Sequence, residues 1–566
     1  MIKNRIFKQE LSIVIAGEAG QGIQTIELLL TKLLKKSGYN VFATKEYMSR
    51  VRGGANSTQI RIGSNPVCSY VENIDFLLVL NSESFERSKK TITQSTIVIG
   101  DKKTLNTQDP IVDIPFSELA KGVGGVIFSN IVVAGFLCGM LGLERGLLND
   151  LLKKMFLSKG EDIVNKNILA SIEGFKQGQE FVSNNSLSFE IGKNKDISNQ
   201  LFLNATQAIA LGAIAGGCNF ISSYPMSPST GVLVFLAQQA EKFGIVVEQA
   251  EDEISAINMA LGAWYAGSKA LVTTSGGGFA LMTEGISLAG CIESPLVVHL
   301  AQRPGPATGL PTRTEQGDLE FALYSGHGEF PRVIFTPGNI QDAFFCAREA
   351  FLIADKYQVP VIILTDQYFL DSYYNLSDFS ASIKPIDNYF VKTAKDYKRY
   401  QFTESGVSER GIPGFGEGLV CADSDEHDES GYITEDLELR VKMVDKRLKK
   451  KELLVKDAVK PELIGSSDYK KLIIGWGSTY HSIKEALAKT KDPKTSFLYL
   501  KQVYPLPEGL TSYMSKAKEI IVVENNATGQ LAKLIRQETG ITVNRKVLKY
   551  NGLMFSVEEL IEKLYL

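Results

Sequence analysis

The 566-residue sequence predicts an α/β protein built from three α/β domains with mainly parallel sheets. Two observations lead to this fold class. Short apolar runs of strand length alternate with longer amphipathic helical patterns, which is typical of βαβ units and parallel sheets. The alternation occurs in three separate stretches, divided by polar or glycine-rich segments, and a chain of this length is expected to form several domains.

The first α/β domain is expected over residues 10–182. It contains a glycine-rich turn followed by an apolar-periodic helix over Gln24–Lys36. Strands are expected at Leu11–Ala16, Phe76–Leu80 and Thr96–Ile99. Polar residues dominate 183–199, and we interpret this stretch as an exposed linker.

The second domain, residues 200–385, has the clearest α/β pattern in the chain. Helices are expected at Ser229–Phe243 and Gln341–Tyr357. Strands are expected at Phe220–Ser223, Ile245–Glu248, Ala270–Thr274, Leu296–Leu300, Val333–Thr336 and Val359–Leu364.

Residues 386–467 differ from the segments on either side. Glycines and an acidic cluster come first, and a basic, helix-like run over Arg440–Lys451 follows. Few apolar residues repeat, so we expect an ordered connector without a core of its own. Residues 468–566 return to the α/β pattern, with strands at Leu472–Gly475, Phe497–Tyr499 and Glu519–Val523.

The composition is that of an ordinary globular protein. Hydrophobic residues make up 44% of the chain, charged residues 22%, and the net charge is -3. This balance predicts neither a nucleic-acid partner nor a membrane partner, and no apolar run reaches the roughly 18 residues of a membrane helix. The polar first nine residues do not resemble a signal peptide, so a cytoplasmic location is expected.

The six cysteines lie far apart and form no CxxC pair. Disulfides and iron–sulfur clusters are usually held by cysteines at characteristic spacings. We therefore expect reduced, mostly buried thiols, and no iron–sulfur cluster carried by this chain.

A glycine-rich turn, Gly17-Glu-Ala-Gly20-Gln-Gly22, lies between the first strand and the first helix. Glycines allow close backbone approach, and a helix N-terminus offers free N–H groups to a phosphate. The spacing departs from GxGxxG, so a tight structural turn is the competing interpretation. A nearby loop carries Arg50 and Arg52, which suit phosphates or an acidic partner surface, or form a solvated basic loop.

Three loops follow predicted strands of the second domain, where ligands bind in open α/β sheets. The first, Ser223–Thr230, holds two prolines and several hydroxyls that suit a carboxylate or carbonyl oxygen. Ser229 or Thr230 is alternatively a helix cap. The second contains Gly276, Gly277 and Gly278, whose entropic cost indicates close approach of a ligand or chain. The third begins at Arg303, which can clamp a carboxylate.

Glu253 is the acid expected to lie in apolar surroundings. At helical spacing it shares a face with Ala256, Ile257 and Ala260, whereas Glu251 faces Ser255. A carboxyl group placed there needs a partner or a raised pKa. The competing interpretation is an acidic helix start, which the helix dipole favours.

Together, these residues resemble the 2-oxoacid:ferredoxin oxidoreductase family in its fused gamma–alpha subunit form, over nearly the whole chain. The first domain is similar to the gamma domain, the second to the pyrimidine-binding alpha domain, and the third to the transketolase C-terminal type. The motifs that carry the resemblance are Gly17–Gly22, Arg50–Asn56, Tyr224–Thr230, Glu251–Glu253, Arg303–Asp318, Glu426–Gly431, Tyr504–Pro507 and Val523–Gln530.

The resemblance implies a thiamine-diphosphate mechanism. Glu253 matches the glutamate that bonds N1′ of the aminopyrimidine and so promotes loss of the thiazolium C2 proton. The 2-oxoacid then loses CO2, coenzyme A takes the acyl group, and electrons pass to ferredoxin. Substrate contacts are implied for Tyr224, Ser227, Ser229 and Arg303, and cofactor contacts for the glycines at 276–278 and at positions 17, 20 and 22.

Three positions depart from the family pattern. Ser227 stands where the family has threonine, Ala19 replaces a glycine of the first turn, and Gln207 replaces a usual acid. The sequence also lacks the GDG…Asn motif for thiamine diphosphate and Mg²⁺. The resemblance therefore implies that the diphosphate, the Mg²⁺ and a [4Fe-4S] cluster belong to a separate beta subunit, in an (αβ)₂ assembly.

Several functional alternatives remain open at this point. The PxTGLPTxTEQ-type loop and the fused arrangement favour 2-oxoglutarate or a broad substrate range over pyruvate, branched-chain or aryl 2-oxoacids. A non-catalytic scaffold that retains the fold is expected to lose Glu253 or Arg303, and both are present. A nucleotide-dependent enzyme using the Gly17–Gly22 turn would bind nucleotide without a partner chain.

Overall fold

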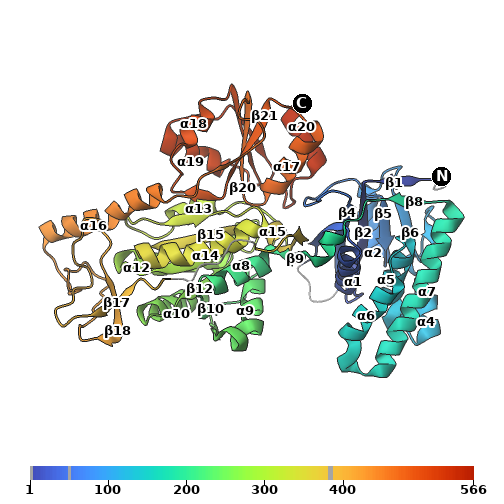
Figure 1. Ribbon diagram of the computed structural model, residues 1–566, viewed down its shortest axis with the longest axis horizontal. Helices are drawn as coiled ribbons and strands as arrows, with labels where there is room; N and C mark the ends of the chain where they lie inside the picture. Colours follow the sequence, from blue (N-terminus) through green and yellow to red (C-terminus); the bar gives the residue numbers. More distant parts are fainter. Residues whose placement is uncertain (1–3, 49–52, 380–386, 566) are drawn as a thin grey trace. The chain divides into compact units, whose positions relative to one another are not determined.

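The computed structural model describes residues 4–48, 53–379 and 387–565, so Arg50 and Arg52 lie outside the described residues. The chain divides into two compact units (Figure 1). Unit 1 comprises Met1–Leu203, Asp371–Asp378 and Ser556–Glu558. Unit 2 comprises Asn204–Leu370, Phe379–Phe555 and Glu559–Leu566. The domain boundaries expected from the sequence stay predictions.

Unit 1 contains an eight-stranded mixed sheet in the order β7-β6-β5-β2-β4-β3-β16-β9. The pairs among β2, β5, β6 and β7 are parallel, whereas β4 lies antiparallel to both β2 and β3. Only the first half of this sheet therefore has the expected parallel pattern. The strands are β2 (Glu10–Ala19), β3 (Asn40–Glu46), β4 (Gly53–Gly63), β5 (Phe76–Val79), β6 (Ile97–Gly100), β7 (Val112–Asp113), β9 (Leu201–Asn204) and β16 (Tyr373–Leu376).

Glycines allow the closest helix pair of unit 1 to form. A Cβ on Gly135 or Gly139 of α5 (Ser129–Met140) would lie 2.3 or 2.1 Å from a backbone oxygen of α7 (Glu161–Asn185). A Cβ on Gly174 of α7 would lie 1.9 Å from Val132 O. The other helices of at least seven residues in this unit are α1 (Ile23–Lys36), α2 (Ser82–Ser88), α4 (Phe116–Val123) and α6 (Arg145–Phe156).

The stretch expected to be a linker is more ordered than its composition indicates. Helix α7 continues to Asn185, and β8 (Ser188–Glu190) pairs in parallel with β1 (Ile6–Lys8). Backbone pairing to the start of the chain explains this order, because short-range composition does not report long-range hydrogen bonds.

Within the described ranges, no single helix has both the length and the apolar character of a membrane span; a bent pair, Phe116–Val123 with Val126–Met140, meets the criteria on length and composition alone.

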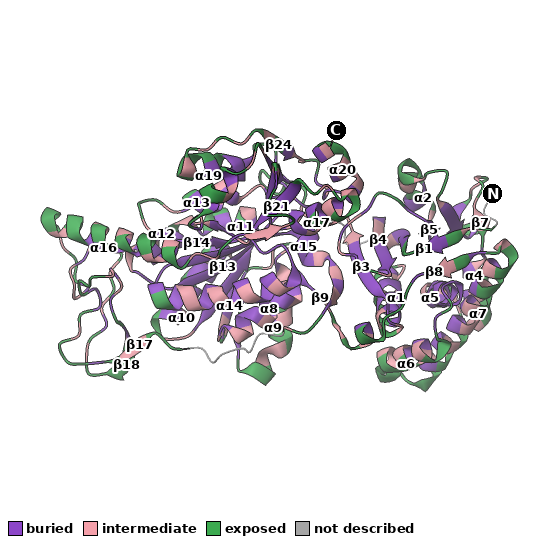
Figure 2. Cartoon of the chain, turned by 45° about the horizontal axis from the view of Figure 1, so that its top comes forward, coloured by how far each residue is buried: buried purple, intermediate pink, exposed green. Residues whose placement is uncertain are grey.

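Unit 2 contains a seven-stranded sheet in the order β11-β10-β12-β13-β15-β14-β22. All pairs are parallel except β14 with β22. The central strands are buried over their whole length (Figure 2), as expected for a parallel sheet covered on both faces. The strands are β10 (Phe220–Ser223), β11 (Val246–Gln249), β12 (Ala270–Thr274), β13 (Leu296–Gln302), β14 (Val333–Phe335), β15 (Pro360–Asp366) and β22 (Gln502–Tyr504).

Most helices of this part of unit 2 follow a strand of the seven-stranded sheet in the chain. Two of them, α8 (Ala205–Ala215) and α14 (Ile340–Tyr357), pack closely because a Cβ on Gly212 would lie 2.2 Å from Phe344 O. The remaining helices between the strands are α9 (Thr230–Phe243), α10 (Glu253–Tyr265), α11 (Gly276–Leu281), α12 (Thr283–Cys291), α13 (Leu319–Tyr324) and α15 (Gln367–Asp371).

A five-stranded sheet completes unit 2, in the order β19-β21-β20-β23-β24, with only the β19–β21 pair antiparallel. The strands are β19 (Glu462–Ile464), β20 (Lys471–Trp476), β21 (Thr495–Leu500), β23 (Glu519–Glu524) and β24 (Arg545–Leu548). Helices α17 (Thr479–Thr490), α18 (Leu510–Met514), α19 (Gln530–Thr539) and α20 (Val557–Tyr565) accompany them. The predicted α/β class with mainly parallel sheets is confirmed.

Buried charges hold the connector, which is part of unit 2, to the segment that carries Glu293. The connector's helix α16 (Leu437–Lys456) places Lys446 and Lys450, both at most 4% exposed, with a nitrogen of each 2.6 Å from a carboxylate oxygen of Glu293. The two ammonium groups hold the Glu293 pKa well below its usual range, and burial lowers the Lys450 pKa to about 8. The connector also contains β17 (Phe390–Thr393) and β18 (Arg410–Gly416).

Candidate active site

The three strand-end loops singled out in the sequence lie at one edge of the seven-stranded sheet. Strands β10, β12 and β13 are consecutive neighbours and run parallel. Their carboxyl ends therefore point in the same direction, toward the edge where ligands bind in such sheets. The loop after β10 contains Tyr224–Ser229, the turn after β12 contains Gly276–Gly278, and Arg303 directly follows β13.

Glu253 is the first residue of α10, and its side chain is buried. The preceding Asp252 caps the helix by accepting a hydrogen bond from Ser255 N, which leaves the Glu253 carboxyl free of capping. The residue is 3% exposed, and its buried Oε1 has no hydrogen-bond partner. Burial, together with the neighbouring Asp252 charge, raises the Glu253 pKa. A buried carboxyl oxygen without a partner is costly, which is typical of a site that a ligand completes.

Two of the three consecutive glycines lie so close to a carboxyl group that a side chain would not fit. A Cβ on Gly278 would lie 2.4 Å from Glu253 Oε1 and 2.3 Å from Thr274 Oγ1. A Cβ on Gly276 would lie 2.7 Å from Asp318 Oδ2. Gly277 is open, with Ala307 O at 3.9 Å from its ideal Cβ position. Gly276 and Gly278 therefore serve close approach and not an unusual backbone conformation, because both lie in the first turn of helix α11.

Arg303 is joined to the loop that follows β10. Its Nη1 donates a hydrogen bond of 2.8 Å to Ser227 O, while its buried Nε has no partner. Tyr224, in the same loop, is 41% exposed. The fully buried Ser229 donates its hydroxyl to Met226 O and makes no side-chain cap bond to α9, although it is the N-cap residue. The alternative interpretation of Ser229 as a side-chain cap of α9 is thus wrong, because its hydroxyl closes the loop instead.

Asp318 is a site residue that the sequence reasoning did not single out. It is the N-cap residue of α13, yet its side chain makes no cap hydrogen bond, and capping by aspartate typically contributes ~1 kcal/mol. Its buried Oδ2 has no partner and lies against Gly276. Burial raises the Asp318 pKa to about 6, although the Arg303 charge opposes the shift. A buried acid that does not cap its own helix is visible only in the folded chain.

The glycine-rich turn of unit 1 is shorter than expected. Strand β2 continues to Ala19, so Gly17 lies inside the strand, where a Cβ would be 2.7 Å from Gln21 Oε1. Gly20 and Gly22 form the turn, with φ of 99° and 77°, and Gly22 is the N-cap residue of α1. At these φ values a side chain would be strained, so the turn requires glycine.

The turn borders two cavities of unit 1. The larger, about 660 Å³, combines the turn with polar and apolar side chains. Its lining includes Gly20, Gly22, Asp101, Thr104, Ser117, Asn130, Lys159, Val126, Ile127, Phe128 and Phe156. The smaller, about 290 Å³, is lined by the same two glycines and by Glu27, Lys45 and Thr58. Glu27 accepts a hydrogen bond from Thr58 Oγ1, and burial raises the Glu27 pKa.

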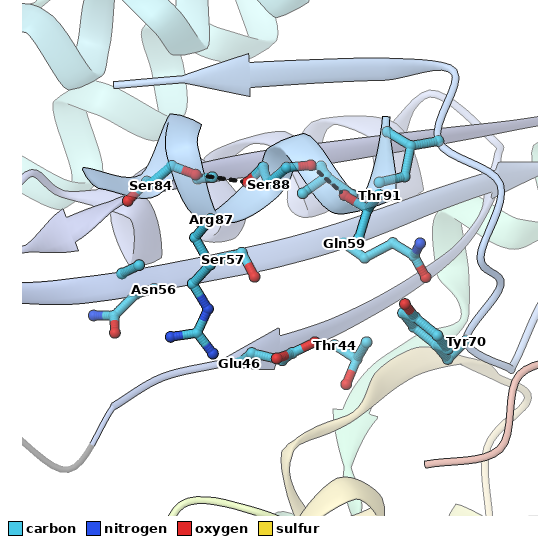
Figure 3. Close-up of a pocket in the computed structure, with 14 residues that line it drawn as sticks. Thr44, Glu46, Asn56, Ser57, Gln59, Tyr70, Ser84, Arg87, Ser88 and Thr91 are labelled. Carbon is cyan, nitrogen blue, oxygen red and sulfur yellow. Dashed lines mark hydrogen bonds between the residues drawn. The ribbon is translucent and has the colours of Figure 1, made fainter. Parts of the chain in front are cut away.

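Two further cavities are lined by neither the strand-end loops of unit 2 nor the glycine-rich turn of unit 1. One, about 120 Å³, lies among strands β2, β3 and β4 and helix α2, and Figure 3 shows Glu46, Gln59, Tyr70 and Arg87 around it. The other, about 620 Å³, is lined in unit 2 by Cys291, Arg440, Arg447 and Glu426, among others. Among the described residues, no three His, Cys, Asp or Glu side chains are grouped so as to hold a metal ion.

Comparisons with known proteins agree with the geometry. The family model described as "Pyruvate flavodoxin/ferredoxin oxidoreductase, thiamine diP-bdg" matches residues 211–446, which include the strand-end loops. The model described as "Pyruvate ferredoxin/flavodoxin oxidoreductase" matches residues 12–177.

Individual relatives match over almost the full chain. The 2-oxoacid:ferredoxin oxidoreductase subunit alpha of Sulfolobus sp. is 30% identical over 98% of this chain and 96% of its own length. The 2-oxoglutarate oxidoreductase subunit KorA of Mycobacterium tuberculosis is 28% identical over 98% of this chain and 90% of its own length. A solved structure of 2-oxoglutarate:ferredoxin oxidoreductase from Magnetococcus marinus, with 2-oxoglutarate, coenzyme A and succinyl-CoA bound, is 30% identical, covers 99% of both chains and gives a TM-score of 0.91.

The match in sequence and fold therefore covers both units. Glu253 and the turn at Gly276–Gly278 lie inside the region that matches the thiamine-binding model. The chain belongs to the 2-oxoacid:ferredoxin oxidoreductase alpha subunits, and its activity is that of an oxidoreductase working as part of a complex.

Proposed function

We propose that this chain, paired with a beta subunit, oxidatively decarboxylates 2-oxoglutarate to the acyl-CoA and CO2 and delivers the electrons to ferredoxin. The observation that carries the proposal is the Glu253 carboxyl, buried beside Gly278 with one oxygen lacking a partner. The family resemblance implies that this position bonds N1′ of the thiamine aminopyrimidine. The relatives' names supply the reaction class.

The residues present fit the aminopyrimidine end of thiamine diphosphate. Glu253 Oε1 offers a hydrogen-bonding partner to a ring nitrogen, and its raised pKa favours a carboxyl that shares its proton with that nitrogen. Gly277 has an open face where a flat ring can approach the backbone. The bound cofactor supplies the electron sink for decarboxylation. As the family resemblance implies, we assign the diphosphate, Mg²⁺ and a [4Fe-4S] cluster to the beta subunit.

The substrate side of the site is proposed to use Arg303, Ser227 and Tyr224. Arg303 already donates to Ser227 O through Nη1, and its buried Nε, which has no partner, is proposed to donate to the carboxylate of a 2-oxoacid. Ser229 is proposed to hold the loop shape through its bond to Met226 O. Holding the oxoacid in one orientation next to the cofactor favours reaction, because the entropy cost of aligning the reacting groups is then met when the substrate binds.

The glycine turn of unit 1 is proposed to contribute to the coenzyme A site. Gly20 and Gly22 border the 660 Å³ cavity at the N-terminus of α1, where backbone N–H groups suit a phosphate. The Magnetococcus marinus relative has coenzyme A bound, and we propose this turn as part of the corresponding site in this chain. Gly17 is proposed to act only inside the strand, where it leaves room for Gln21.

The assay co-expresses this chain with its candidate beta subunit under anaerobic conditions and follows coenzyme-A-dependent reduction of a viologen dye. Turnover is expected to be fastest with 2-oxoglutarate, in parallel reactions with pyruvate and 2-oxoisovalerate. The pyruvate oxidoreductase descriptions of the matched family models make pyruvate the second candidate. Failure of every 2-oxoacid to reduce the dye would refute the proposed function.

Glu253→Gln tests the assigned role of the buried carboxyl. The amide keeps the size of the side chain but cannot share an acid proton with the ring, so kcat is expected to fall by at least about 100-fold. Glu251→Gln is the matched control, because Glu251 is exposed, lies just before α10 and accepts a hydrogen bond from Ser255 in the first turn of that helix. Near-normal turnover of an assembled Glu253→Gln complex would contradict the role.

A further inference from the structure

The loop that begins with Arg303 is closed at its base by a residue of the seven-stranded sheet. This loop, residues 303–318, starts directly after β13 and ends at Asp318, the N-cap residue of α13. The fully buried Gln302, the last residue of β13, accepts a 2.9 Å hydrogen bond at its Oε1 from Asp318 N. Both ends of the 303–318 loop therefore meet at one strand end.

The first half of the 303–318 loop is exposed and lies at the glycine turn. Residues 305–310 are all exposed, and Ala307 O is 3.9 Å from the ideal Cβ position of Gly277. The loop thus borders the place proposed for the 2-oxoacid and the aminopyrimidine. A change in the position of the loop would change the shape of that place.

Gln316, in the second half of the loop, makes four hydrogen bonds to the C-terminal segment, which we define as residues 468–555. Its backbone N–H donates to Asn525 O at 2.7 Å, and its backbone O accepts from Asn526 Nδ2 at 3.1 Å. Its side-chain Nε2 donates to Trp476 O and its Oε1 accepts from Asn525 N, each at 2.9 Å. The fully buried side chain thus uses both a donor and an acceptor, which an amide supplies and an apolar side chain does not.

The C-terminal segment binds the neighbouring loop residues as well. Thr314 N donates to Gly552 O at 3.2 Å, and Gly317 O accepts from Gln530 Nε2 at 2.7 Å. A Cβ on Gly552 would lie 3.2 Å from Leu310 Cδ1, so the segment also packs against the exposed half of the loop. The position of the loop is therefore set by a part of the chain more than 150 residues away in sequence.

The partners of Gln316 lie at the carboxyl edge of the five-stranded sheet. Trp476 is the last residue of β20, and Asn525 directly follows β23, the neighbouring parallel strand. In open α/β sheets this edge is where ligands bind. Here it is occupied by Gln316, so the C-terminal segment holds a loop of its own chain at the place where other sheets hold a ligand.

We propose that Gln316 is a positioning residue of the 2-oxoacid site: its amide lets the C-terminal segment hold the 303–318 loop against the glycine turn, so that the loop and Arg303 keep the shape of the substrate site. The inference rests on the proposed function, since it takes Arg303 as the residue that binds the substrate carboxylate. Gln316 acts through the loop, because its own side chain is directed at Trp476 and Asn525. A misplacement of about 1 Å can lower a reaction rate by about 100-fold.

Gln316→Met is the first test, because it keeps the length of the side chain and removes both amide hydrogen bonds. The anaerobic complex with its beta subunit is assayed by viologen reduction, and kcat/KM is measured for coenzyme A and for the 2-oxoacid that wild type turns over fastest. For the 2-oxoacid, kcat/KM is expected to fall at least about 10-fold, whereas the value for coenzyme A should stay within about 2-fold of wild type. A variant that only folds poorly lowers both values by the same factor, because it reduces the amount of active enzyme.

Thr336→Val is the matched control. Thr336 is as buried as Gln316, and its Oγ1 donates a 3.0 Å hydrogen bond to Leu500 O, so the change removes a buried bond to the C-terminal segment outside the loop. Both kcat/KM values of this control are expected to stay within about 2-fold of wild type. Gln530→Met removes the bond to Gly317 O and should show the selective loss even if Gln316→Met does not assemble.

Cleavage by trypsin after Arg313 tests the anchoring of the loop without turnover. Arg313 is half-buried and lies three residues before Gln316. The full-length chain is digested briefly, and the fragments that end at Arg313 are quantified by mass spectrometry. Gln316→Met is expected to be cut there at least about 10-fold faster than wild type, because the freed loop opens more often, and Thr336→Val should be cut at the wild-type rate.

The inference is overturned if kcat/KM for the 2-oxoacid is unchanged, if both kcat/KM values fall equally in the two loop variants, or if cleavage after Arg313 keeps its wild-type rate. A failure of the proposed function gives a different result, because the wild-type complex then reduces the dye with no 2-oxoacid. Failure of the inference alone leaves an active wild-type complex and variants without a selective loss.

Discussion

Replacing Gly278 with alanine tests the close approach of the glycine turn to the buried glutamate. The new methyl group would lie 2.4 Å from Glu253 Oε1 and 2.3 Å from Thr274 Oγ1, about 1 Å inside ordinary van der Waals contact. Both neighbours are buried, at 3% and 0% exposure, so neither can move into solvent. Overpacking of this kind costs about 1–3 kcal/mol, and here it also displaces the carboxyl from its site.

Gly277→Ala is the matched control, one residue away in the same helix. Its methyl group meets only Ala307 O, at 3.9 Å, so stability is expected to be unchanged or raised by up to about 1 kcal/mol. The two variants are compared by urea unfolding of the purified chain, followed by fluorescence of the two tryptophans, Trp264 and Trp476. Equal unfolding midpoints for Gly278→Ala and Gly277→Ala would refute the packing argument.

Two further predictions concern packing and buried charge. Gly174→Ala would place a methyl group 1.9 Å from a backbone oxygen of α5 and is expected to destabilise unit 1 by about 3 kcal/mol. Gly146→Ala is the control, because Gly146 has open space around it and its replacement should not destabilise the unit. Thermal unfolding of both variants checks this. Glu293→Gln leaves Lys446 and Lys450 without their buried partner, so a loss of about 3–5 kcal/mol and faster proteolysis of the connector at pH 7 are expected. Folding lowers the pKa of Glu293, so the stability that this residue supplies is complete above pH 4.5 and falls as the pH drops below that value. If proteolysis of the wild-type connector is no faster at pH 3 than at pH 7, this reasoning is contradicted.

The sequence determined the elements whose residues carry their own pattern. Strands β10 and β12 begin and end at the predicted residues, because short runs of strand length between longer helical patterns are local signals. Helical spacing also singled out Glu253 as the acid that shares a face with Ala256, Ile257 and Ala260, with an exposed acidic helix start as the alternative, and its burial agrees with the first interpretation. Local geometry sufficed in these cases.

Tertiary structure decided the features that depend on residues far apart in the chain. The antiparallel pairing of β4 with β2, the order of the expected linker and the burial of Lys446 and Lys450 on a helix with a basic sequence all rest on such partners. Asp318 belongs to this group, because only folding brings its carboxyl group against Gly276. Local propensity is set within a few residues, whereas charge pairing and close packing are set by which distant segments meet.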